Sequence, residues 1–591
     1  MRNRMPRRGA AAVAGALAVT LAGGVTAAAI GPLGTADRSA ELHRQIDASK
    51  PRNVILLIGD GTDESIITAA RNYEKGANGR FALDDLPFVG DVTVHGLKTG
   101  PGPDYVINYV SDSAPTASAW STGHKTVDSR VSQGPSIDDT TPGTDYETVL
   151  ETYAAQGKRT GNVSTAEITD ATPAAAAAHI NLRACQGPTD MASCSYARKA
   201  NGGKGSIAEQ LVDNQIDVIL GGGRNRFNQP TDAGPSVTGY AQATHGYRDI
   251  DSKQELAALT SLDDGPVLGL FAGGNMTPMY APRVASPGGA STPTAERCTP
   301  ANRGDQPTLA EMTDKAIELL DNPKGFFLQV ESAMVDKQEH GSDVCGAIGD
   351  VQALDDALQV ALTYQQTHPD TLIIVTADHS HSTQIVGGPT DGKQTAQVLT
   401  ADGDPMWLAY STSDVGSDHT GSTVRIAAKG PQAANVTGLI DQTDIHATLL
   451  GRTPSTLDQS TRTVVVPGPT QTVTTPATTV TTTAPAPAPA SAPQVSPQAP
   501  GLSVAAPKAI SPRALRRGGL PVAVAVTGAS SVDVELVLGR RTIARRTLSR
   551  AGNTTLKPSA RTRLSGRTLQ VRASASGPGG ASDASQRVSL R

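Results

Sequence analysis

Short apolar runs alternate with helical patterns between residues 53 and 452. The runs have the length and composition of buried strands, and they are Val54–Ile58, Arg159–Val163, Asp217–Leu220, Phe326–Val330 and Thr371–Thr376. Between them, Leu309–Leu320 and Val351–Leu362 carry apolar residues at three- and four-residue intervals, the spacing of one helix face. This alternation predicts an α/β domain, placed at residues 40–455, with a mostly parallel central sheet flanked by helices.

Acidic residues stand directly after three of the predicted strands. Asp60 follows the first strand, Glu331 the fourth, and Asp378 with His379 the fifth. In sheets of this class, ligands bind at the carboxyl ends of the strands. Carboxylates gathered there would repel one another, and a bound cation removes that repulsion. The sequence therefore predicts a metal site at this edge of the sheet.

Asp336 and His340 lie four residues apart just after Glu331, so they share one face of a predicted helix. Carboxylate oxygen together with imidazole nitrogen suits zinc, whereas carboxylates alone suit magnesium. An Asp and a His at this spacing also occur on ordinary solvated helix faces. The acidic strand ends around the pair favour the metal interpretation.

Asp112 and Ser113 begin a stretch of small residues after a strand-like start at Tyr109. A serine at a helix N-terminus lies where backbone N–H groups and the helix dipole favour an anion. The alternative is that Asp112-Ser113 only caps a helix. Gly221-Gly222-Gly223 lacks the Lys-Ser/Thr of a phosphate-binding loop and predicts a tight turn instead.

Residues 1–29 have the pattern of an export signal. Four arginines precede an apolar run that ends in Ala27-Ala28-Ala29. This predicts a secreted or otherwise extracytoplasmic protein, with an uncleaved membrane anchor as the alternative. Arg7-Arg8 is a weak indication of the twin-arginine route, because only Gly and Ala follow it.

The chain has four cysteines, and an even number in an exported protein predicts disulfides. Three pairings are open. Proximity along the chain favours Cys185–Cys194 with Cys298–Cys345, and buried free thiols are the alternative.

The C-terminal part of the chain has a different composition. Residues 456–512 are predicted to be a linker, because 463–507 contain no charge and consist largely of Thr, Val, Pro and Ala. Residues 513–591 contain 15 Lys and Arg against three Asp and Glu, and runs such as Val522–Val526 and Val532–Leu538 alternate like strands. We expect a small, basic, all-β module there. Its arginine pairs suit an anionic polymer or the cell wall, and a solvated spacer is the alternative.

Several separate motifs resemble the bacterial alkaline phosphatases, in the family's order along Pro51–Gly451. They are Ile58-Gly59-Asp60-Gly61, Asp112-Ser113-Ala114, Asn162–Pro173, Gln329–His340, Thr376–His381 and His419-Thr420-Gly421-Ser422. The resemblance does not cover the linker or the basic module.

Transferred position by position, the resemblance implies two zinc ions and one magnesium ion. One zinc is held by Asp336, His340 and His419, and the other by Asp60, Asp378 and His379. Magnesium shares Asp60 and adds Thr172 and Glu331, while Asp170 holds its waters. The remaining roles are Ser113 as nucleophile, Arg183 as phosphate clamp, Asp112 as the residue that orients Arg183, and Lys337 as a water-mediated phosphate contact. The family's disulfides also match Cys185–Cys194 and Cys298–Cys345.

The resemblance implies a homodimeric enzyme that hydrolyses many phosphate monoesters through a phosphoserine and releases inorganic phosphate. Two metal ions can stabilise both the attacking and the leaving oxygen of such a displacement. The sequence departs from the family pattern at Thr62-Asp63-Glu64 and at Pro115. Of the histidines without a ligand role, His381 is placed as a supporting residue beside the ligands.

Two hydrolases of the same superfamily are the nearest alternatives. A sulfatase needs Cys/Ser-x-Pro-x-Arg, and here Ala117 stands where that motif has Arg. Superfamily phosphodiesterases generally lack the third metal site, for which Asp170, Thr172 and Glu331 are present. An alternative of another class is a surface-binding protein that acts through the basic module. We expect no specific recognition of nucleic acid.

Overall fold

The computed structural model describes residues 38–412, 417–451 and 501–590, the last range with short gaps at 528–531, 539–540, 549–551, 560–561, 563–567 and 578–579. The chain divides into two compact units, Met1–Arg462 and Thr463–Arg591. The predicted export signal and most of the predicted linker lie outside the described residues. Within those residues, we find no helix with the length and apolar character needed to span a membrane.

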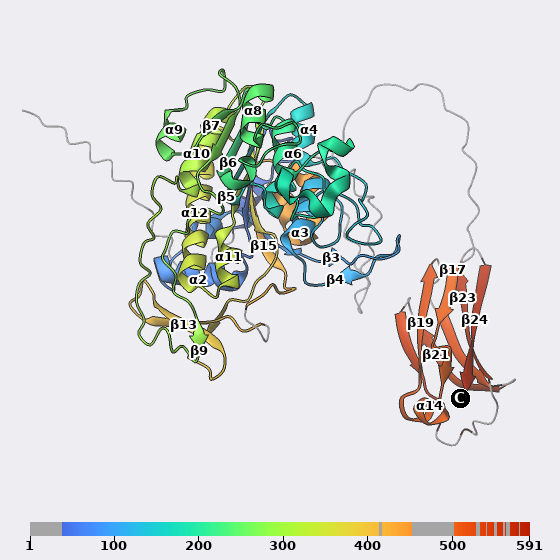
Figure 1. Cartoon of the computed structure of the whole chain (residues 1–591). Helices are drawn as coiled ribbons and strands as arrows, with labels where there is room; N and C mark the ends of the chain where they lie inside the picture. Colours follow the sequence, from blue (N-terminus) through green and yellow to red (C-terminus); the bar gives the residue numbers. More distant parts are fainter. Residues whose placement is uncertain are drawn as a thin grey trace, which may run out of the picture. The chain divides into compact units, whose positions relative to one another are not determined.

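A ten-stranded sheet forms the centre of the first unit (Figure 1). Its order is β16-β2-β15-β11-β1-β10-β5-β6-β8-β7. The strands in that order are Gly438–Asp441, Phe88–Thr93, Val424–Lys429, Thr371–Ala377, Asn53–Gly59, Phe326–Ser332, Arg159–Glu167, Val218–Gly222, Val267–Leu270 and Arg248–Ile250.

The five strands predicted from the sequence lie side by side in this sheet, as β11, β1, β10, β5 and β6. Seven of the nine strand pairings are parallel, and β15 makes the two antiparallel ones, with β11 and β2. The prediction of a mostly parallel sheet is therefore confirmed. The antiparallel strand and the outer strands were not predicted from the sequence.

Alternate residues of β1 face opposite layers of helices. Ile55 and Leu57 pack with one layer, and Val54, Leu56 and Ile58 pack with the other. The first layer contains α9 Lys253–Ala258, α10 Leu309–Leu320 and α12 Val344–Thr367. The second contains α3 Ser113–Thr122, α4 Val149–Ala155, α5 Ala171–Ala174, α6 Ile207–Asp213, α7 Arg224–Phe227, α8 Val237–His245 and α13 Gln442–Leu449. Because both faces are covered, all seven residues of β1 are buried.

A third apolar cluster lies where α2 Glu64–Lys75 meets α12 and a smaller sheet. That sheet has the order β12-β14-β13-β9 and comprises Gln384–Val386, Pro405–Ala409, Gln394–Leu399 and Ser286–Pro287. The disulfide Cys298–Cys345 joins this cluster to the start of α12, and Cys185–Cys194 lies within the second helix layer. Both predicted pairings are thus present in the structure.

The second unit contains two mostly antiparallel sheets, which share an apolar cluster of their own. The three-stranded sheet comprises β17 Gly501–Ala505, β19 Leu520–Thr527 and β22 Gly552–Leu556. The five-stranded sheet comprises β18 Ala509–Ile510, β24 Gly580–Leu590, β23 Thr568–Gly577, β20 Val532–Leu538 and β21 Arg541–Leu548. Strand β17 lies within the stretch that the sequence assigns to the linker. The helix α14 Pro512–Gly518 was not predicted either; it begins at the N-cap Ser511 and ends at Gly519.

Leu56→Ala tests the central position of β1. Leu56 is fully buried between two strands and under a helix layer. Truncation should lower the free energy of unfolding by about 2–5 kcal/mol, because it leaves a cavity that close-packed neighbours cannot fill. Chemical denaturation of both variants measures this, with Leu439→Ala as the matched control, since Leu439 is 66% exposed. Equal effects of the two substitutions would contradict the assignment of the core.

Candidate active site

The carboxyl ends of three adjacent strands bring acidic residues to one place. Glu331 lies opposite Ile58 in the register of β10 with β1, and Gly59 lies opposite Ala377 in the register of β1 with β11. Asp60 and Asp378 follow Gly59 and Ala377 directly, so their carboxylates lie at the same edge of the sheet. All three acidic residues are at most 2% exposed. The strand ends that the sequence singled out therefore converge.

Asp60, Asp378 and His379 form one group whose oxygen and nitrogen atoms all lie within 4.8 Å of one another. His379 Nε2 is 3.4 Å from Asp60 Oδ1 and 3.2 Å from Asp378 Oδ2. Burial, together with the charges of Asp378 and Asp336, raises the pKa of Asp60 well above its usual value. Burial lowers the pKa of His379. The group thus has two buried carboxylates and a neutral imidazole, a donor set that suits zinc.

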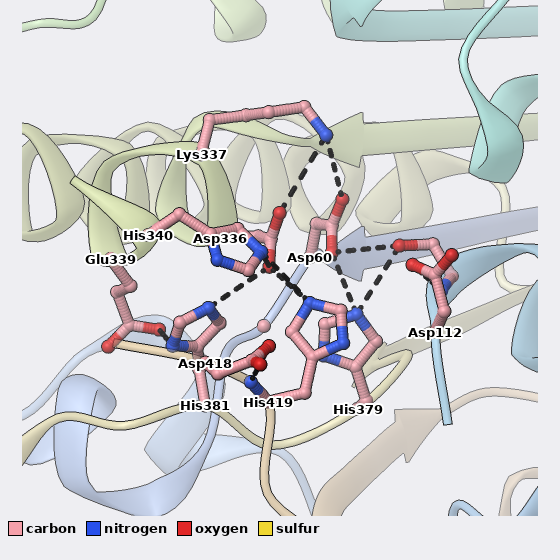
Figure 2. Close-up of polar contacts among 12 residues, drawn as sticks. Asp60, Asp112, Asp336, Lys337, Glu339, His340, His379, His381, Asp418 and His419 are labelled. Atoms are coloured by element: carbon pink, nitrogen blue, oxygen red, sulfur yellow. Dashed lines mark hydrogen bonds and ion pairs between the residues drawn. The ribbon is translucent and has the colours of Figure 1, made fainter. Parts of the chain in front are cut away.

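Asp336, His340, His419 and His381 form a second group of this kind (Figure 2). Asp336 Oδ1 is 3.3 Å from His340 Nε2, 3.1 Å from His419 Nε2 and 3.4 Å from His381 Nε2. The two imidazole nitrogens of His340 and His419 also face each other at 3.1 Å. Two nitrogens and a carboxylate oxygen that point to one spot are a typical arrangement of zinc ligands.

Helix α11 Met334–His340 places this second group, because it begins two residues after β10 ends. Asp350 of α12 fixes that junction: its Oδ2 accepts hydrogen bonds from Met334 N at 2.8 Å and from Ser332 Oγ at 3.0 Å. Asp336 and His340 then project from one face of α11, as their spacing predicts.

Glu331 and Asp170 lie near the first group: the charges of Asp170 and Asp378 both act on Glu331, and Lys337 Nζ is within 4.0 Å of carboxylate oxygens of Asp60 and Asp170. Burial, together with the charges of Asp170 and Asp378, raises the pKa of Glu331 to about 8, although a hydrogen bond from Ser164 Oγ opposes the shift. Thr172 belongs to the short helix α5, and its carbonyl accepts a hydrogen bond from Gln329 of β10 at 3.0 Å. Its own Oγ1 is buried and has no hydrogen-bond partner among the described residues.

Ser113 is the first residue of α3, and its side chain points at the first group. Ser113 Oγ is 3.3 Å from His379 Nε2 and 3.5 Å from Asp60 Oδ1. Asp112 is the N-cap of this helix, and its Oδ1 accepts a hydrogen bond from Ser113 N at 2.8 Å. The capping interpretation of Asp112 is therefore confirmed, and the hydroxyl of Ser113 is still directed at buried carboxylate and imidazole groups.

Arg183 lies between two carboxylates. Its Nη1 donates to Asp112 Oδ1 at 2.8 Å and to Asp112 Oδ2 at 2.9 Å, and its Nη2 donates to Asp170 Oδ1. Lys337 Nζ is 2.9 Å from Asp170 Oδ2 and 4.0 Å from Asp60 Oδ2. Burial alone would raise the pKa of Asp170, but the charges of Arg183 and Lys337 outweigh it and lower that pKa. The positively charged side chains of Arg183 and Lys337 are thus held next to Ser113 and the first group.

Buried polar atoms without a partner support bound cations here. Asp378 Oδ2, like Thr172 Oγ1, is buried and accepts no hydrogen bond from the described residues. A buried carboxylate oxygen that accepts no hydrogen bond is costly, and metal coordination removes the cost. The residues present therefore fit cations at both histidine-containing groups.

Glu339 supports the second group and was not singled out from the sequence. It is fully buried, its Oε1 accepts a hydrogen bond from Thr383 Oγ1, and its Oε2 is 3.8 Å from His381 Nδ1 (Figure 2). Its place three residues after Asp336 predicts only a shared helix face. Glu339 is buried by contact with Thr383, which lies 44 residues away along the chain.

Gly61 allows β1 and α11 to approach each other at the site. Its φ is +66°, a conformation that glycine adopts without strain. A Cβ at this position would lie 3.1 Å from both Cα and Cβ of Asp336. Gly61 N also donates a hydrogen bond to Asp378 Oδ1 at 3.0 Å. A side chain at residue 61 would therefore separate the two groups.

Comparison with known proteins identifies the family of this chain. The family described as Alkaline phosphatase matches residues 51–415. This chain belongs to the alkaline phosphatase family. It is 46% identical over 430 residues to the alkaline phosphatase of Escherichia coli (strain K12), which covers 70% of this chain and 88% of that protein. It is 41% identical over 447 residues to a streptomycin-6-phosphate phosphatase of Streptomyces griseus, which covers 72% of this chain and 96% of that protein.

The fold agrees as well. A cold-active alkaline phosphatase from the psychrophile Shewanella sp. superposes with a TM-score of 0.51 at 23% identity, covering 67% of this chain and 98% of that chain. The predicted alkaline phosphatase-like fold and family are thus confirmed. The chain is a phosphoric monoester hydrolase of a metal-dependent family.

Gly61→Ala should lower phosphatase activity by roughly tenfold or more, because moving reacting groups by about 1 Å can cost about 100-fold in rate. Gly403→Ala is the matched control: Gly403 also has a positive φ, +88°, but no atom lies within 4 Å of its added Cβ. Steady-state assays together with thermal unfolding separate the loss of activity from the backbone strain that both variants share. Equal activity of the two variants would contradict the role assigned to Gly61.

Proposed function

We propose that this alkaline phosphatase works through a phosphoserine formed on Ser113, at a site that holds two zinc ions and one magnesium ion. The observation that carries the proposal is the position of Ser113 Oγ, which points at Asp60 and His379 with Arg183 held nearby by Asp112.

The donor sets assign the ions. One zinc is held by Asp336, His340 and His419, and the other by Asp60, Asp378 and His379. Magnesium is held by Asp60, Glu331 and Thr172, with Asp170 nearby, because these residues offer oxygen only. When bound, the ions supply Lewis-acid stabilisation of negative charge on the attacking, leaving and phosphoryl oxygens.

The residues of the chain carry the rest of the reaction. Arg183 binds two phosphoryl oxygens with its planar guanidinium, a geometry that lysine lacks. Ser113 Oγ gives its proton to solvent and attacks phosphorus, the bond from phosphorus to the ester oxygen breaks, and the leaving oxygen takes a proton from solvent and departs as the alcohol. Water then attacks phosphorus and gives a proton to solvent, the bond to Ser113 Oγ breaks, Oγ takes up a proton from solvent, and inorganic phosphate is released. Lys337 adds positive charge beside Asp170 and Asp60.

The proposed site grips the phosphoryl group and not the alcohol, so we propose a broad range of phosphate monoesters. The Streptomyces griseus relative is named for a single sugar-derived monoester, streptomycin 6-phosphate. The two possibilities differ in kcat/KM across a panel of unrelated monoesters. A broad enzyme gives values within about tenfold of each other, because specificity beyond that needs contacts to the alcohol.

We further propose that the protein is exported, is a homodimer, and meets an anionic polymer of the cell envelope through its basic module. Export is supported by the pattern of residues 1–29 and by the two disulfides, which persist outside reducing compartments.

Ser113→Ala tests the nucleophile. With zinc and magnesium present, the variant should lose p-nitrophenyl phosphate hydrolysis by at least about 100-fold, since covalent catalysis needs the hydroxyl. Ser236→Ala, which removes a hydroxyl from the N-cap of α8, should keep activity. A bis-p-nitrophenyl phosphate assay and a p-nitrophenyl sulfate assay complete the set. Faster diester or sulfate turnover than monoester turnover would sink the proposal.

Metal removal should affect stability as well as activity. Without cations, the buried carboxylates of Asp60 and Asp378 repel each other, so chelated protein should unfold several degrees lower. Adding back zinc should restore the unfolding temperature, and magnesium alone should restore it only in part. Scanning calorimetry with elemental analysis measures this, and an unfolding temperature that chelation leaves unchanged would argue against structural metal binding.

A further inference from the structure

Positive charge gathers at one end of the C-terminal module. We call this end the basic tip and define it by six exposed residues: Lys508, Arg513, Arg516, Arg517, Arg541 and Lys557. They come from four separate segments, namely the chain before β18, helix α14, the start of β21 and the end of β22.

The strand registers place these segments together. Leu520, just after α14, lies opposite Leu556, which precedes Lys557. In the other sheet Leu538 lies opposite both Arg541 and Leu569, and Ser589 lies opposite Thr568 and Ala509. Arg516 Nη2 also donates to the carbonyl of Thr562 at 2.9 Å. Figure 1 shows α14 at this end of the module.

The first described residue of the second unit, Gly501, lies at the opposite end of the module. Gly501 lies opposite Thr527, at the end of β19 remote from α14. The basic tip is therefore the end of the module farthest along its strands from residue 501.

The acidic residues of the module differ in their distance from the tip: Asp533 is remote, whereas Glu535 Oε2 accepts a hydrogen bond at 3.3 Å from Thr542, the neighbour of Arg541. Asp533 and Asp583 both lie opposite Ser574, and Glu535 lies opposite Arg572, so all three carboxylates share one face of the five-stranded sheet. Asp533 is five residues before Leu538 on β20, about 17 Å at ~3.3 Å per residue. Arg545 on that face pairs with Asp533 at 2.9 Å and with Glu535 at 3.4 Å. This sheet face is balanced in charge.

The tip has no such balance. Lys508, Arg513, Arg517, Arg541 and Lys557 make no ion pair with a carboxylate in the part of the chain that the structure describes. Clustered exposed charges of one sign raise the local concentration of oppositely charged partners. The tip is therefore a strongly positive surface beside a neutral one.

The apolar surface of the module separates two kinds of anionic partner. Large apolar side chains that are well exposed all belong to the first unit, among the described residues. Clustered cations attract anionic lipid headgroups as well as anionic polymers. Stable peripheral binding to a bilayer is usually strengthened by apolar side chains that enter the headgroup region, so a surface of cations alone favours a polymer.

We propose that the basic tip binds a linear anionic polymer of the cell surface that carries carboxylate or phosphate groups. The inference rests on the proposed contact of the module with such a polymer, and it adds the surface that makes the contact. It is independent of the hydrolytic mechanism, which belongs to the first unit.

The test uses the full-length protein and immobilised polygalacturonate. This polymer carries carboxylates and no phosphate groups, so the active site has no phosphate to bind. The tip variant combines Arg513→Gln, Arg517→Gln, Arg541→Gln and Lys557→Gln. The matched control removes the same charge elsewhere on the module through Arg545→Gln, Arg546→Gln, Arg572→Gln and Arg587→Gln. Neutral dextran and vesicles that contain anionic lipid are measured in parallel.

The tip variant should bind polygalacturonate about tenfold or more weakly and with a flatter dependence on salt, and the control should lose about threefold or less. Both should retain p-nitrophenyl phosphate hydrolysis, so failure of this proposal is distinct from failure of the proposed function. Equal losses in both variants, absence of binding by the wild type, or tighter binding to vesicles would each overturn the proposal.

Polymer protection of the wild-type protein keeps the test valid if a variant unfolds. Polygalacturonate should slow acetylation of Lys508 and Lys557 relative to Lys253, an exposed lysine of the first unit. Mass spectrometry measures the ratio. If polygalacturonate slowed acetylation of Lys253 more than that of Lys508 and Lys557, a contact at the tip would be contradicted.

Discussion

Mutual repulsion among buried carboxylates is the constraint on which this active site depends. Asp60, Glu331 and Asp378 stand at the ends of adjacent parallel strands and are almost completely buried. The raised pKa values of Asp60 and Glu331 express the free energy of that repulsion and burial. Two histidine-containing groups and a buried threonine hydroxyl surround the carboxylates. Bound cations account for all of these features together.

The fold holds the carboxylates in this position. Parallel register aligns the ends of β1, β10 and β11, and Gly61 lets β1 end against α11. Asp350 ties the junction between β10 and α11, so Asp336 and Lys337 project over the strand ends. Helix α3 then supplies Ser113 from the other side, with Asp112 linking its N-terminus to Arg183.

The sequence predicted the central strands well, and it singled out residues that the structure brings together, because both leave local patterns. Five apolar runs became five adjacent strands, and the acidic residue after each of three runs reached the site. Strands β2, β15 and β16 were missed because they are short or partly exposed and their pairing depends on distant segments. Glu339 was missed because Thr383 and His381, distant in the sequence, determine its burial. Strand β17 lies in an uncharged Pro- and Ala-rich stretch and forms only through pairing with β19.

Anomalous X-ray diffraction at the zinc absorption edge tests the central claim most directly. Crystals of the zinc- and magnesium-loaded protein should give one peak among Asp336, His340 and His419 and a second among Asp60, Asp378 and His379. The site beside Glu331 and Thr172 should show density without an anomalous signal at that edge, as expected for magnesium. Crystals of the loaded, active protein with no anomalous peak at either histidine-containing group would contradict the account.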